Sequence, residues 1–376
     1  MINRQLQTQL EKRWATGKAL VVLGPRQVGK TTLLKALCAS KGNYLFLDGD
    51  QSTDRNLLSE ANVERLKQII GTHSVVLVDE AQRIKNIGLT LKIITDQFPH
   101  IQLVVSESSA LELANEISEP LTGRKWEYRL YPFSWVELQN HIGYLAAQKQ
   151  LETRLIYGFY PEIINRVGDE REVLKELLSS YLYRDLLQYE GIRKPQLLNQ
   201  LLTALALQLG SEVSLNELSQ LLQVSRITVE QYIDLLEKAF IVFRLSPLSR
   251  NLRNEITSNR KVYFYDNGIR NALLSDFKPL ALRSDTGALW ENFVIAERQK
   301  QLEYGRSWAK PYFWRTYQQQ EIDYVEENEG DFRAFEIKWN PKAKAKFPST
   351  FIESYQPIEK HVITPDNFTD FVSAID

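Results

Sequence analysis

The sequence has a single cysteine and no long apolar run, and both scarcities restrict the class of protein. Cys38 is the one cysteine among 376 residues, so the chain cannot form an internal disulfide. No segment reaches the roughly 18 uninterrupted apolar residues of a membrane helix, since even the run that begins at Leu201 soon ends at Gly210. Residues 1–5 lack the apolar core of a signal peptide. We therefore expect a cytoplasmic protein that does not enter the membrane.

The chain also has almost no net charge. Lysine plus arginine minus aspartate plus glutamate gives 46 − 47 = −1, so no overall field draws the molecule to nucleic acid or to an anionic membrane. Any such binding must come from local patches. A length of 376 residues with 43% apolar residues is enough for the cores of two or three domains. We find no internal repeat and no low-complexity tract.

Apolar runs and helical stretches alternate in the first third of the chain. Residues 19–23, 75–78 and 101–105 are short continuous apolar runs with helical segments between them. This pattern is typical of a parallel sheet that is covered on both faces. After Pro132 the apolar spacing becomes helical, and it predicts an all-helical section with helices over 152–166, 170–189 and 196–209.

The last part of the chain returns to strands. Short amphipathic helices are expected between Ser214 and Glu237, followed by strands over 240–247 and 261–265, which is the order of a winged helix-turn-helix. A further α/β region follows, with a helix over 289–302 and strands over 312–315, 322–325 and 334–339. The fold class is therefore α/β, with a parallel-sheet domain, a helical segment and a second α/β part.

The first apolar run leads into a glycine-containing loop of the form Gly-x-x-x-x-Gly-Lys-Thr. Such a loop follows a strand and opens a helix, because its backbone N–H groups and the helix N-terminus then surround phosphate oxygens. Lys30 is expected to reach the β- and γ-phosphates of a purine nucleoside triphosphate, and Thr31 to bind magnesium. The expected nucleotide-binding residues are Gly24, Pro25, Arg26, Gln27, Val28, Gly29, Lys30, Thr31 and Thr32.

An apolar strand about 50 residues further on ends in two carboxylates. After a P-loop, this arrangement predicts that Asp79 holds the magnesium ion, through water, and that Glu80 polarises the attacking water. The alternative is that the two acids cap the next helix.

Three motifs together resemble a prokaryotic AAA family ATPase. They are residues 24–32 (Gly-Pro-Arg-Gln-Val-Gly-Lys-Thr-Thr), residues 77–84 (Leu-Val-Asp-Glu-Ala-Gln-Arg-Ile), and Leu-Thr-Gly-Arg at 121–124 followed by Tyr-Pro-Phe-Ser-Trp at 131–135. The resemblance implies an AAA-type P-loop domain that binds and hydrolyses ATP with Mg²⁺.

The resemblance also implies a sensor and an arginine. The family has Thr-Gly-Ser-Ser at the end of its third strand, where this chain has residues 106–109 (Ser-Glu-Ser-Ser). We expect Ser108 or Ser109 to sense the γ-phosphate, although Glu107 adds charge and bulk in place of glycine. Arg124 matches a family arginine that we expect to reach a phosphate from a neighbouring subunit of a homo-oligomer. The alternative for Arg124 is a surface arginine.

The helix-turn-helix candidate carries both basic and acidic residues on the face that would contact DNA. Its second helix exposes Arg226, Thr228 and Gln231, but also Glu230 and Asp234, which would face phosphate poorly. Sequence-specific reading is therefore poorly supported. The ribbon that follows is more basic, with a local charge of +5 − 1 = +4 that suits contact with the DNA backbone. Its charged residues are Arg244, Arg250, Arg253, Arg260 and Lys261 against Glu255. The alternative is a helical module that packs on the ATPase or on a partner.

Two predicted strands carry an acidic and basic constellation. Glu336 and Lys338 lie two residues apart on one strand face, where they can meet Asp323 of the adjacent strand. Such a set can hold a divalent metal, with the lysine positioning a water for phosphodiester attack. It resembles the PD-(D/E)xK nuclease core, in which a helical glutamate, here Glu291 or Glu297, completes the site. The alternative is a salt-bridged strand pair.

A basic strip follows this constellation, and it could track a phosphate backbone or form a solvated loop. Its residues are Lys342, Lys344 and Lys346. The second part of the chain further resembles the uncharacterised C-terminal domain that follows this ATPase in many bacterial and archaeal chains. The matching motifs are residues 158–162 (Gly-Phe-Tyr-Pro-Glu), 183–186 (Tyr-Arg-Asp-Leu) and 289–293 (Leu-Trp-Glu-Asn-Phe).

These observations divide the chain into four expected parts. They are an AAA-type P-loop ATPase domain (1–140), a helical linker or lid (141–210), a winged helix-turn-helix (211–265) and a nuclease-like domain (266–376). We expect an oligomeric ATP-driven factor that binds or processes DNA. The alternative is a nucleotide-dependent switch or scaffold that binds protein partners and has an inactive nuclease-like site.

Overall fold

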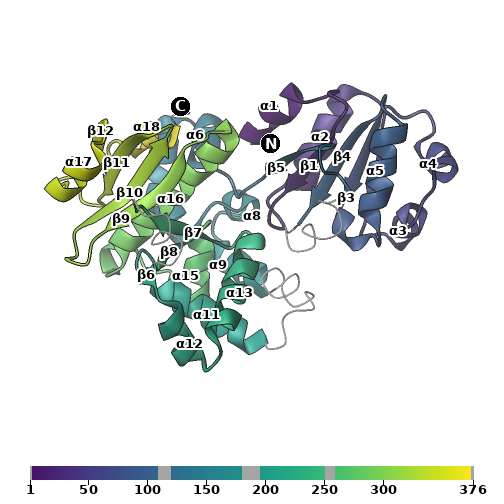
Figure 1. Ribbon diagram of the computed structural model, residues 1–376. Coiled ribbons are helices and arrows are strands. Elements are labelled where there is room, and N and C mark those ends of the chain that lie inside the picture. Colours follow the sequence, from purple (N-terminus) through teal and green to yellow (C-terminus); the bar gives the residue numbers. More distant parts are fainter. Residues whose placement is uncertain (1, 109–119, 180–194, 250–258, 374–376) are drawn as a thin grey trace. The chain divides into compact units, whose positions relative to one another are not determined.

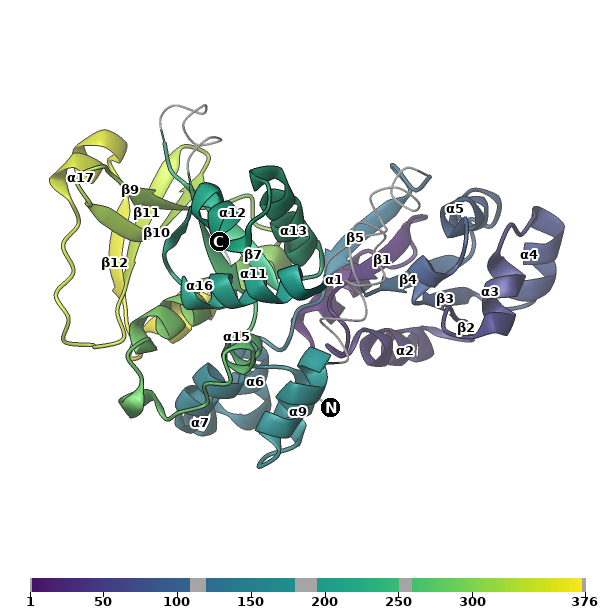
Figure 2. The same ribbon diagram turned by 90° about the horizontal axis from the view of Figure 1, so that it is seen from below.

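The computed structural model describes residues 2–108, 120–179, 195–249 and 259–373 (Figures 1 and 2). The chain forms two compact units. The first, here called the N-terminal unit, consists of Met1–Phe133 with Lys238–Phe240, and the second, the C-terminal unit, of Ser134–Glu237 with Ile241–Asp376.

The N-terminal unit is built on a parallel sheet of five strands in the order β2-β3-β4-β1-β5. Strands β1, β3 and β4 are buried along their whole length, as expected for apolar runs covered on both faces. This confirms the parallel sheet expected from the three apolar runs. The strands are β1 (Ala19–Leu23), β2 (Tyr44–Asp48), β3 (Val75–Asp79), β4 (Gln102–Glu107) and β5 (Lys125–Arg129).

Helices cover both faces of this sheet. The crossover through α2 and the crossover through α5 run in opposite directions along the sheet, and right-handed connections then place the two helices on opposite faces (Figure 2). Strand β4 lies between β1 and β3, so the ends of all three strands meet at one edge. The helical elements are α1 (Gln5–Lys12), α2 (Lys30–Lys41), α3 (Ser52–Leu58), α4 (Val63–Ile70), η1 (Ala81–Arg83) and α5 (Ile87–Gln97).

The C-terminal unit begins with helices. The single helix expected over 152–166 is two helices, because Gly158 ends α7 with a φ of 76° and Pro161 starts α8. The helix expected over 170–189 begins as α9, and its part beyond residue 179 lies outside the described residues. The helices of this section are α6 (Trp135–Ile142), α7 (Tyr144–Tyr157), α8 (Pro161–Asn165), α9 (Glu170–Leu177), α11 (Pro195–Leu207), α12 (Leu215–Leu222) and α13 (Arg226–Lys238).

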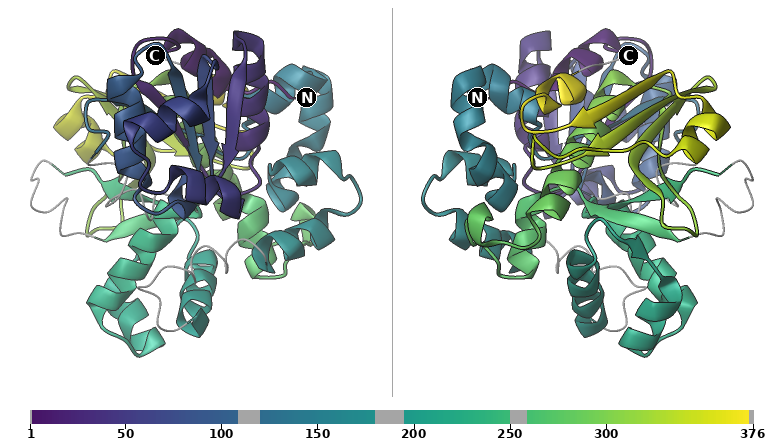
Figure 3. Two further views of the ribbon diagram at one scale, coloured as in Figure 1. Left: turned by 90° about the vertical axis from the view of Figure 1, so that its right-hand side faces the viewer. Right: turned by 90° about the vertical axis from the view of Figure 1, so that its left-hand side faces the viewer.

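A seven-stranded mixed sheet forms the rest of the C-terminal unit, in the order β12-β11-β10-β9-β7-β8-β6 (Figure 3). The strands are β6 (Glu212–Val213), β7 (Val242–Pro247), β8 (Arg260–Phe264), β9 (Lys310–Arg315), β10 (Glu321–Asn328), β11 (Asp331–Ile337) and β12 (Glu359–Ile363). The remaining helices are α15 (Asn267–Leu273), η3 (Leu280–Leu282), α16 (Thr286–Gly305), α17 (Ser349–Tyr355) and α18 (Phe368–Ser373).

One sheet therefore crosses the division expected at residues 265 and 266. Strand β7 pairs in parallel with β9 through Ser246 and Pro247, which join the ribbon β7-β8 to the strands β9 to β12. Strand β7 begins at Val242 rather than at Phe240, because Phe240 has a φ of 59° and is not extended. An α/β fold with a parallel sheet, a helical section and a further α/β region is thus confirmed, and the finer four-part division stays a prediction.

Two motifs singled out in the sequence, residues 158–162 and 289–293, contribute to the core of the C-terminal unit. Phe159 and Phe293 stack at 5.8 Å between ring centroids, and Trp135 and Trp290 pack around Phe293. The Asp266 carboxylate accepts hydrogen bonds from the backbone N–H of Phe159 at 2.7 Å and of Ile269 at 3.2 Å. These motifs hold the fold together, and residues 183–186 lie outside the described residues.

Candidate nucleotide site and candidate C-terminal site

The loop between β1 and α2 has the backbone that a phosphate cradle requires. Gly24 packs so closely on the backbone of Leu130 that a Cβ atom there would lie 2.1 Å from the carbonyl oxygen. Gly29, directly before α2, has a φ of 92°, which glycine adopts without strain. The sequence therefore places glycine where the loop turns and where it opens the helix.

Lys30 is the first residue of α2 and is almost fully buried. Its Nζ atom donates hydrogen bonds to the carbonyl oxygens of Gly24 and Pro25, at 2.8 and 2.9 Å. The ammonium group is therefore held against the loop itself, at the position where the loop would surround phosphates.

Asp79, at the end of β3, lies between α2 and β4. Thr31 Oγ1 donates a hydrogen bond of 2.7 Å to Asp79 Oδ2, and the Ser106 hydroxyl donates to Asp79 Oδ1. The Asp79 side chain is buried. The structure thus brings together two predicted residues that are 48 positions apart, and it adds Ser106 from the neighbouring strand.

Glu80 and Ser108 are connected through a residue that sequence reasoning did not single out. Gln82, in η1, uses its Nε2 atom to donate to Glu80 Oε2 and to Ser108 Oγ, each at 2.7 Å. Both Gln82 and Ser106 lie inside the motifs that carried the resemblance. The direction of their side chains has no signal in the sequence.

Glu107 is fully buried, and it lies between Ser106 and Ser108 in the chain. Successive side chains of a strand point to opposite faces, so Glu107 faces away from the side on which Ser106 and Ser108 make their contacts. Its side chain therefore lies on the sheet face opposite to that of Ser106. Ser109 lies outside the described residues.

Arg124 lies at the end of the sheet where the parallel strands begin, opposite to the end that carries the P-loop. It precedes β5, and its carbonyl oxygen accepts a hydrogen bond from Ala19 at the start of β1, whereas the P-loop follows the end of β1. The guanidinium group is partly exposed and forms a 2.6 Å ion pair with Asp96. The hydrogen bond between the side chains of Arg124 and Asp96 raises the pKa of Arg124 and lowers the pKa of Asp96. Arg124 therefore does not contact the P-loop of its own chain.

The predicted constellation of Asp323, Glu336 and Lys338 comes together on β10 and at the end of β11. Lys338 Nζ lies 2.7 Å from Asp323 Oδ2 and 2.8 Å from Glu336 Oε2. Asp323 also accepts a hydrogen bond from the backbone N–H of Ile337, at 2.8 Å. Burial, followed by the nearby Asp323 charge, raises the pKa of Glu336 to about 7. The site thus has more negative charge than Lys338 alone balances.

Glu291, on α16, lies near this constellation and Glu297 does not. Glu291 accepts hydrogen bonds from Tyr263 at 2.6 Å and from Lys261 at 3.2 Å. Burial raises its pKa, Lys261 lowers it, and the charge of Asp323 raises it further. The carboxylate of Glu297 instead accepts from the Trp135 backbone N–H and from Lys300. Of the two candidates, only Glu291 therefore interacts electrostatically with Asp323.

Part of the positive charge expected on the ribbon β7-β8 is neutralised inside the unit, which corrects the expectation that Arg244 and Lys261 are available for contact with the DNA backbone. Arg244 forms ion pairs with Asp234 and Glu237. Lys261 is 1% exposed and lies between Glu291 and Glu321, 2.6 Å from the latter. Both cations are held by carboxylates because α13 and α16 pack beside the ribbon. The other expected charges include Arg250, Arg253 and Glu255, which lie outside the described residues.

The basic strip after β11 remains on the surface. Lys342, Lys344 and Lys346 are exposed, and within the described ranges no carboxylate forms an ion pair with them. Those ranges also contain no group of three or more His, Cys, Asp or Glu side chains arranged to hold a metal ion.

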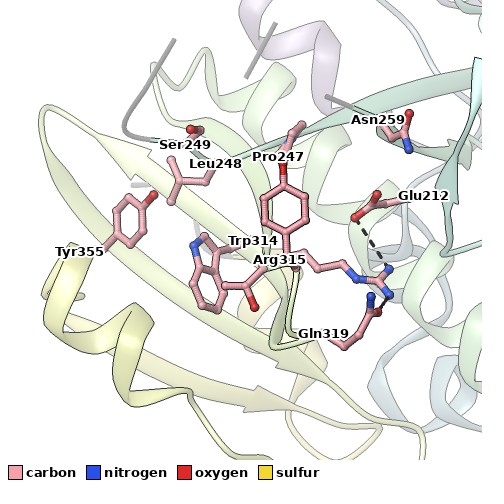
Figure 4. A pocket seen from close by; sticks show the side chains of 11 residues that line it. Glu212, Pro247, Leu248, Ser249, Asn259, Trp314, Arg315, Gln319 and Tyr355 are labelled. Atoms are coloured by element: carbon pink, nitrogen blue, oxygen red, sulfur yellow. Dashed lines mark hydrogen bonds and ion pairs between the residues drawn. The ribbon is translucent and has the colours of Figure 1, made fainter. Parts of the chain in front are cut away.

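A polar cleft of about 720 Å³ lies beside the ribbon, between β7, β9 and α17 (Figure 4). Arg315 reaches across it toward Glu212, at 3.8 Å, and also contacts Gln319. Trp314 and Tyr355 line its other side. The sequence alone does not indicate this cleft, because its residues come from five separate segments.

Comparisons with known proteins agree with the nucleotide site. Residues 16–139 match the AAA domain, residues 148–280 a domain of unknown function (DUF8612), and residues 286–373 another domain of unknown function (DUF4143). Among solved structures, the Walker-type ATPase PABY2304 of Pyrococcus abyssi aligns with a TM-score of 0.50 and 16% identity, over 73% of this chain and 96% of that one. This likeness shows a shared fold.

Relatives that match over most of the chain place it in a family. The uncharacterized protein Rv2008c of Mycobacterium tuberculosis is 31% identical over 335 residues, which cover 87% of this chain and 72% of that protein. The uncharacterized protein MJ1544 of Methanocaldococcus jannaschii is 24% identical, over 80% and 70% of the two chains. The protein is an AAA-family ATPase with a P-loop nucleotide-binding fold. Within that class it belongs to the same family as Rv2008c. No helix in the described segments is long and apolar enough to span a membrane.

Proposed function

We propose that the N-terminal unit binds ATP with magnesium at residues 24–32 and hydrolyses it with Asp79 and Glu80. The observation that carries this proposal is the 2.7 Å hydrogen bond between Thr31 and Asp79. It joins the first turn of the P-loop helix to the end of β3, which is the arrangement that phosphate and metal binding need.

Magnesium fits these two residues. The Thr31 hydroxyl and the Asp79 carboxylate are oxygen donors, and Mg²⁺ binds oxygen while keeping several waters and phosphate oxygens as its other ligands. When bound, the ion neutralises charge on the phosphate oxygens. The N–H groups of the loop and the Lys30 ammonium bind the phosphates, and Ser108 contacts the γ-phosphate. Glu80 accepts a proton from the attacking water and so orients it.

Changing Glu80→Gln should separate binding from chemistry. The substitution removes the carboxylate that orients water and leaves the loop intact, so turnover should fall by at least about 10²-fold while ATP still binds. Lys30→Ala should weaken both. Steady-state phosphate release and equilibrium nucleotide titration measure the two quantities, and Glu64→Gln, an exposed glutamate of α4, is the control. Wild-type turnover in Glu80→Gln would contradict the assignment.

We further propose that Arg124 acts on ATP bound to a neighbouring subunit of a homo-oligomer. Its partly exposed position at the sheet edge away from the P-loop suits a contact in trans. The ion pair with Asp96 would have to open, and an exposed pair of this kind contributes little to stability. The alternative is a surface arginine that is satisfied by Asp96.

If Arg124 acts in trans, hydrolysis per subunit should rise with protein concentration. Arg124→Ala subunits mixed into wild type should lower the rate by more than their share, because each one also disables a neighbour. An arginine finger contributes about 10³-fold or more to the rate. Phosphate release over a dilution series and a mixing series measures this. A rate independent of dilution that averages linearly on mixing would support the surface-arginine alternative.

For the C-terminal unit we propose a winged-helix and nuclease-like arrangement that contacts DNA through phosphates. The element order β6-α12-α13-β7-β8 supports the winged-helix part, and its two ribbon strands pair antiparallel. The convergence of Asp323, Glu336 and Lys338 supports the nuclease-like part. The exposed strip Lys342, Lys344 and Lys346 follows directly and suits backbone contact.

A divalent metal fits the C-terminal constellation through two carboxylates. Asp323 and Glu336 share one lysine, and the pKa of Glu336 near 7 reflects burial next to a second carboxylate, a charge excess that a cation would relieve. A bound metal would activate a water for attack on a phosphodiester. Lys338 would orient that water, and Glu291 would contribute negative charge from α16.

The second candidate is a nucleotide-dependent switch or scaffold that binds protein and has an inactive nuclease-like site. The internal neutralisation of the carboxylates favours it. Lys338 lies between Asp323 and Glu336, and Lys261 lies between Glu291 and Glu321, so each pair already has a cation. In this account the constellation is a structural salt-bridge network.

DNA titration separates the two candidates. If all three lysines of the strip contact phosphates, the combined change Lys342→Ala, Lys344→Ala and Lys346→Ala should flatten the slope of log K against log salt by up to about 3. Alanine at the exposed Lys12, Lys41 and Lys67 is the matched control. Fluorescence anisotropy with duplex, single-stranded and branched DNA measures it.

Cleavage is a separate readout of the same proposal. With magnesium or manganese, any cleavage should disappear in Asp323→Ala and Lys338→Ala while ATP hydrolysis continues, because the residues of the two sites belong to different units. No measurable DNA affinity at low salt would remove DNA from the proposal and support the protein-binding switch.

A further inference from the structure

The amide of Gln82 contacts both of the groups to which the proposed ATP hydrolysis assigns γ-phosphate recognition and water activation. Its Nε2 atom lies 2.7 Å from Glu80 Oε2 and 2.7 Å from Ser108 Oγ. Gln82 comes from η1, which follows β3, whereas Ser108 follows β4. One side chain thus joins the ends of two strands at the nucleotide site.

The hydrogen bonds fix the orientation of both partners. A primary amide nitrogen carries two N–H groups, so one can go to the carboxylate and one to the hydroxyl. Because Ser108 accepts from Gln82, its own O–H points elsewhere and can donate to a phosphate oxygen. Glu80 uses Oε2 toward Gln82, and its other oxygen remains to accept from a water.

The backbone of Glu80 is already fixed by the fold, and its side chain is what Gln82 controls. Glu80 has a φ of 47°, a left-handed conformation that is strained for a non-glycine residue. The backbone N–H of Gly49 donates to the Asp79 carbonyl oxygen at 2.9 Å, and a Cβ at Gly49 would lie 2.2 Å from the carbonyl oxygen of Glu80. The turn is therefore packed against β2.

We propose that Gln82 is a positioning residue that couples the contact between Ser108 and the γ-phosphate to the orientation of Glu80. The inference rests on the proposed roles of Glu80 and Ser108. When Ser108 donates to the γ-phosphate, its oxygen is fixed, and the amide held by that oxygen keeps Glu80 directed at the attacking water. With a diphosphate this contact is missing, so Glu80 loses its alignment.

The experiment replaces the amide by an apolar group of similar length, Gln82→Met. The single-turnover rate of ATP hydrolysis should fall by about 10²-fold, because a catalytic group displaced by about 1 Å loses that much. Affinity for a non-hydrolysable ATP analogue should stay within about twofold, since Gln82 does not belong to the phosphate cradle. Gln68→Met, on the exposed face of α4, is the matched control and should behave as wild type.

A double-mutant cycle tests the coupling itself. If Ser108 acts on Glu80 through Gln82, the combination of Gln82→Met with Ser108→Ala should be little slower than the slower single variant, because both remove the same connection. Gln82→Glu keeps the size and polarity of the side chain but cannot donate when ionised, so at neutral pH it should lose rate as Gln82→Met does. This variant serves if Gln82→Met does not fold.

The outcomes separate this inference from the function on which it rests. A near wild-type rate in Gln82→Met or in Gln82→Glu overturns it, as do rate losses that multiply in the double variant. A loss of nucleotide affinity equal to the loss of rate also overturns it, because it would mean a structural role. In each of these cases inactive Glu80→Gln would leave the proposed ATPase mechanism standing, whereas active Glu80→Gln would defeat that mechanism first.

Discussion

The nucleotide site depends on how one buried carboxylate, that of Asp79, is held. Thr31 donates to one of its oxygens from α2, and Ser106 donates to the other from β4. A buried carboxylate is costly unless such donors satisfy it, so this interaction fixes the register among the P-loop helix and the two strands. The sheet order makes it possible, because β4 lies between β1 and β3, so Ser106 of β4 can reach Asp79 at the end of β3. At the same edge, the Gln82 amide donates to Glu80 and to Ser108.

The C-terminal unit uses its charges differently. Lys261 and Arg244, which look like DNA contacts in the sequence, are held by carboxylates of α16, β10 and α13. Removing one member of such a buried pair leaves an uncompensated charge and is expected to be strongly destabilising. The ribbon is therefore tied into the α/β part, in agreement with the single sheet that runs from β12 to β6. The lysines of the strip from Lys342 to Lys346, by contrast, remain exposed to solvent.

Much of the fold could be predicted from the sequence because its signals are local. The apolar runs of β1, β3 and β4 and the glycine loop identify a P-loop sheet, and the pairing of Thr31 with Asp79 follows from that topology. Side-chain directions across elements have no local signal, so Gln82 and Ser106 were missed although both lie inside recognised motifs. For the same reason the sequence places Lys261 among the charges that suit DNA contact, since a buried lysine is rare and its acidic partners are 30 and 60 residues away. The choice between Glu291 and Glu297 likewise needed the packing of α16.

The most direct test of the central claim is the effect of magnesium on nucleotide affinity. Calorimetric titration with a slowly hydrolysed ATP analogue, with and without Mg²⁺, should show at least about tenfold tighter binding with the metal in the wild type. If Asp79 and Thr31 hold the ion, Asp79→Asn should remove most of that gain and leave metal-free affinity nearly unchanged. A gain from Mg²⁺ that is as large in Asp79→Asn as in the wild type would contradict the account.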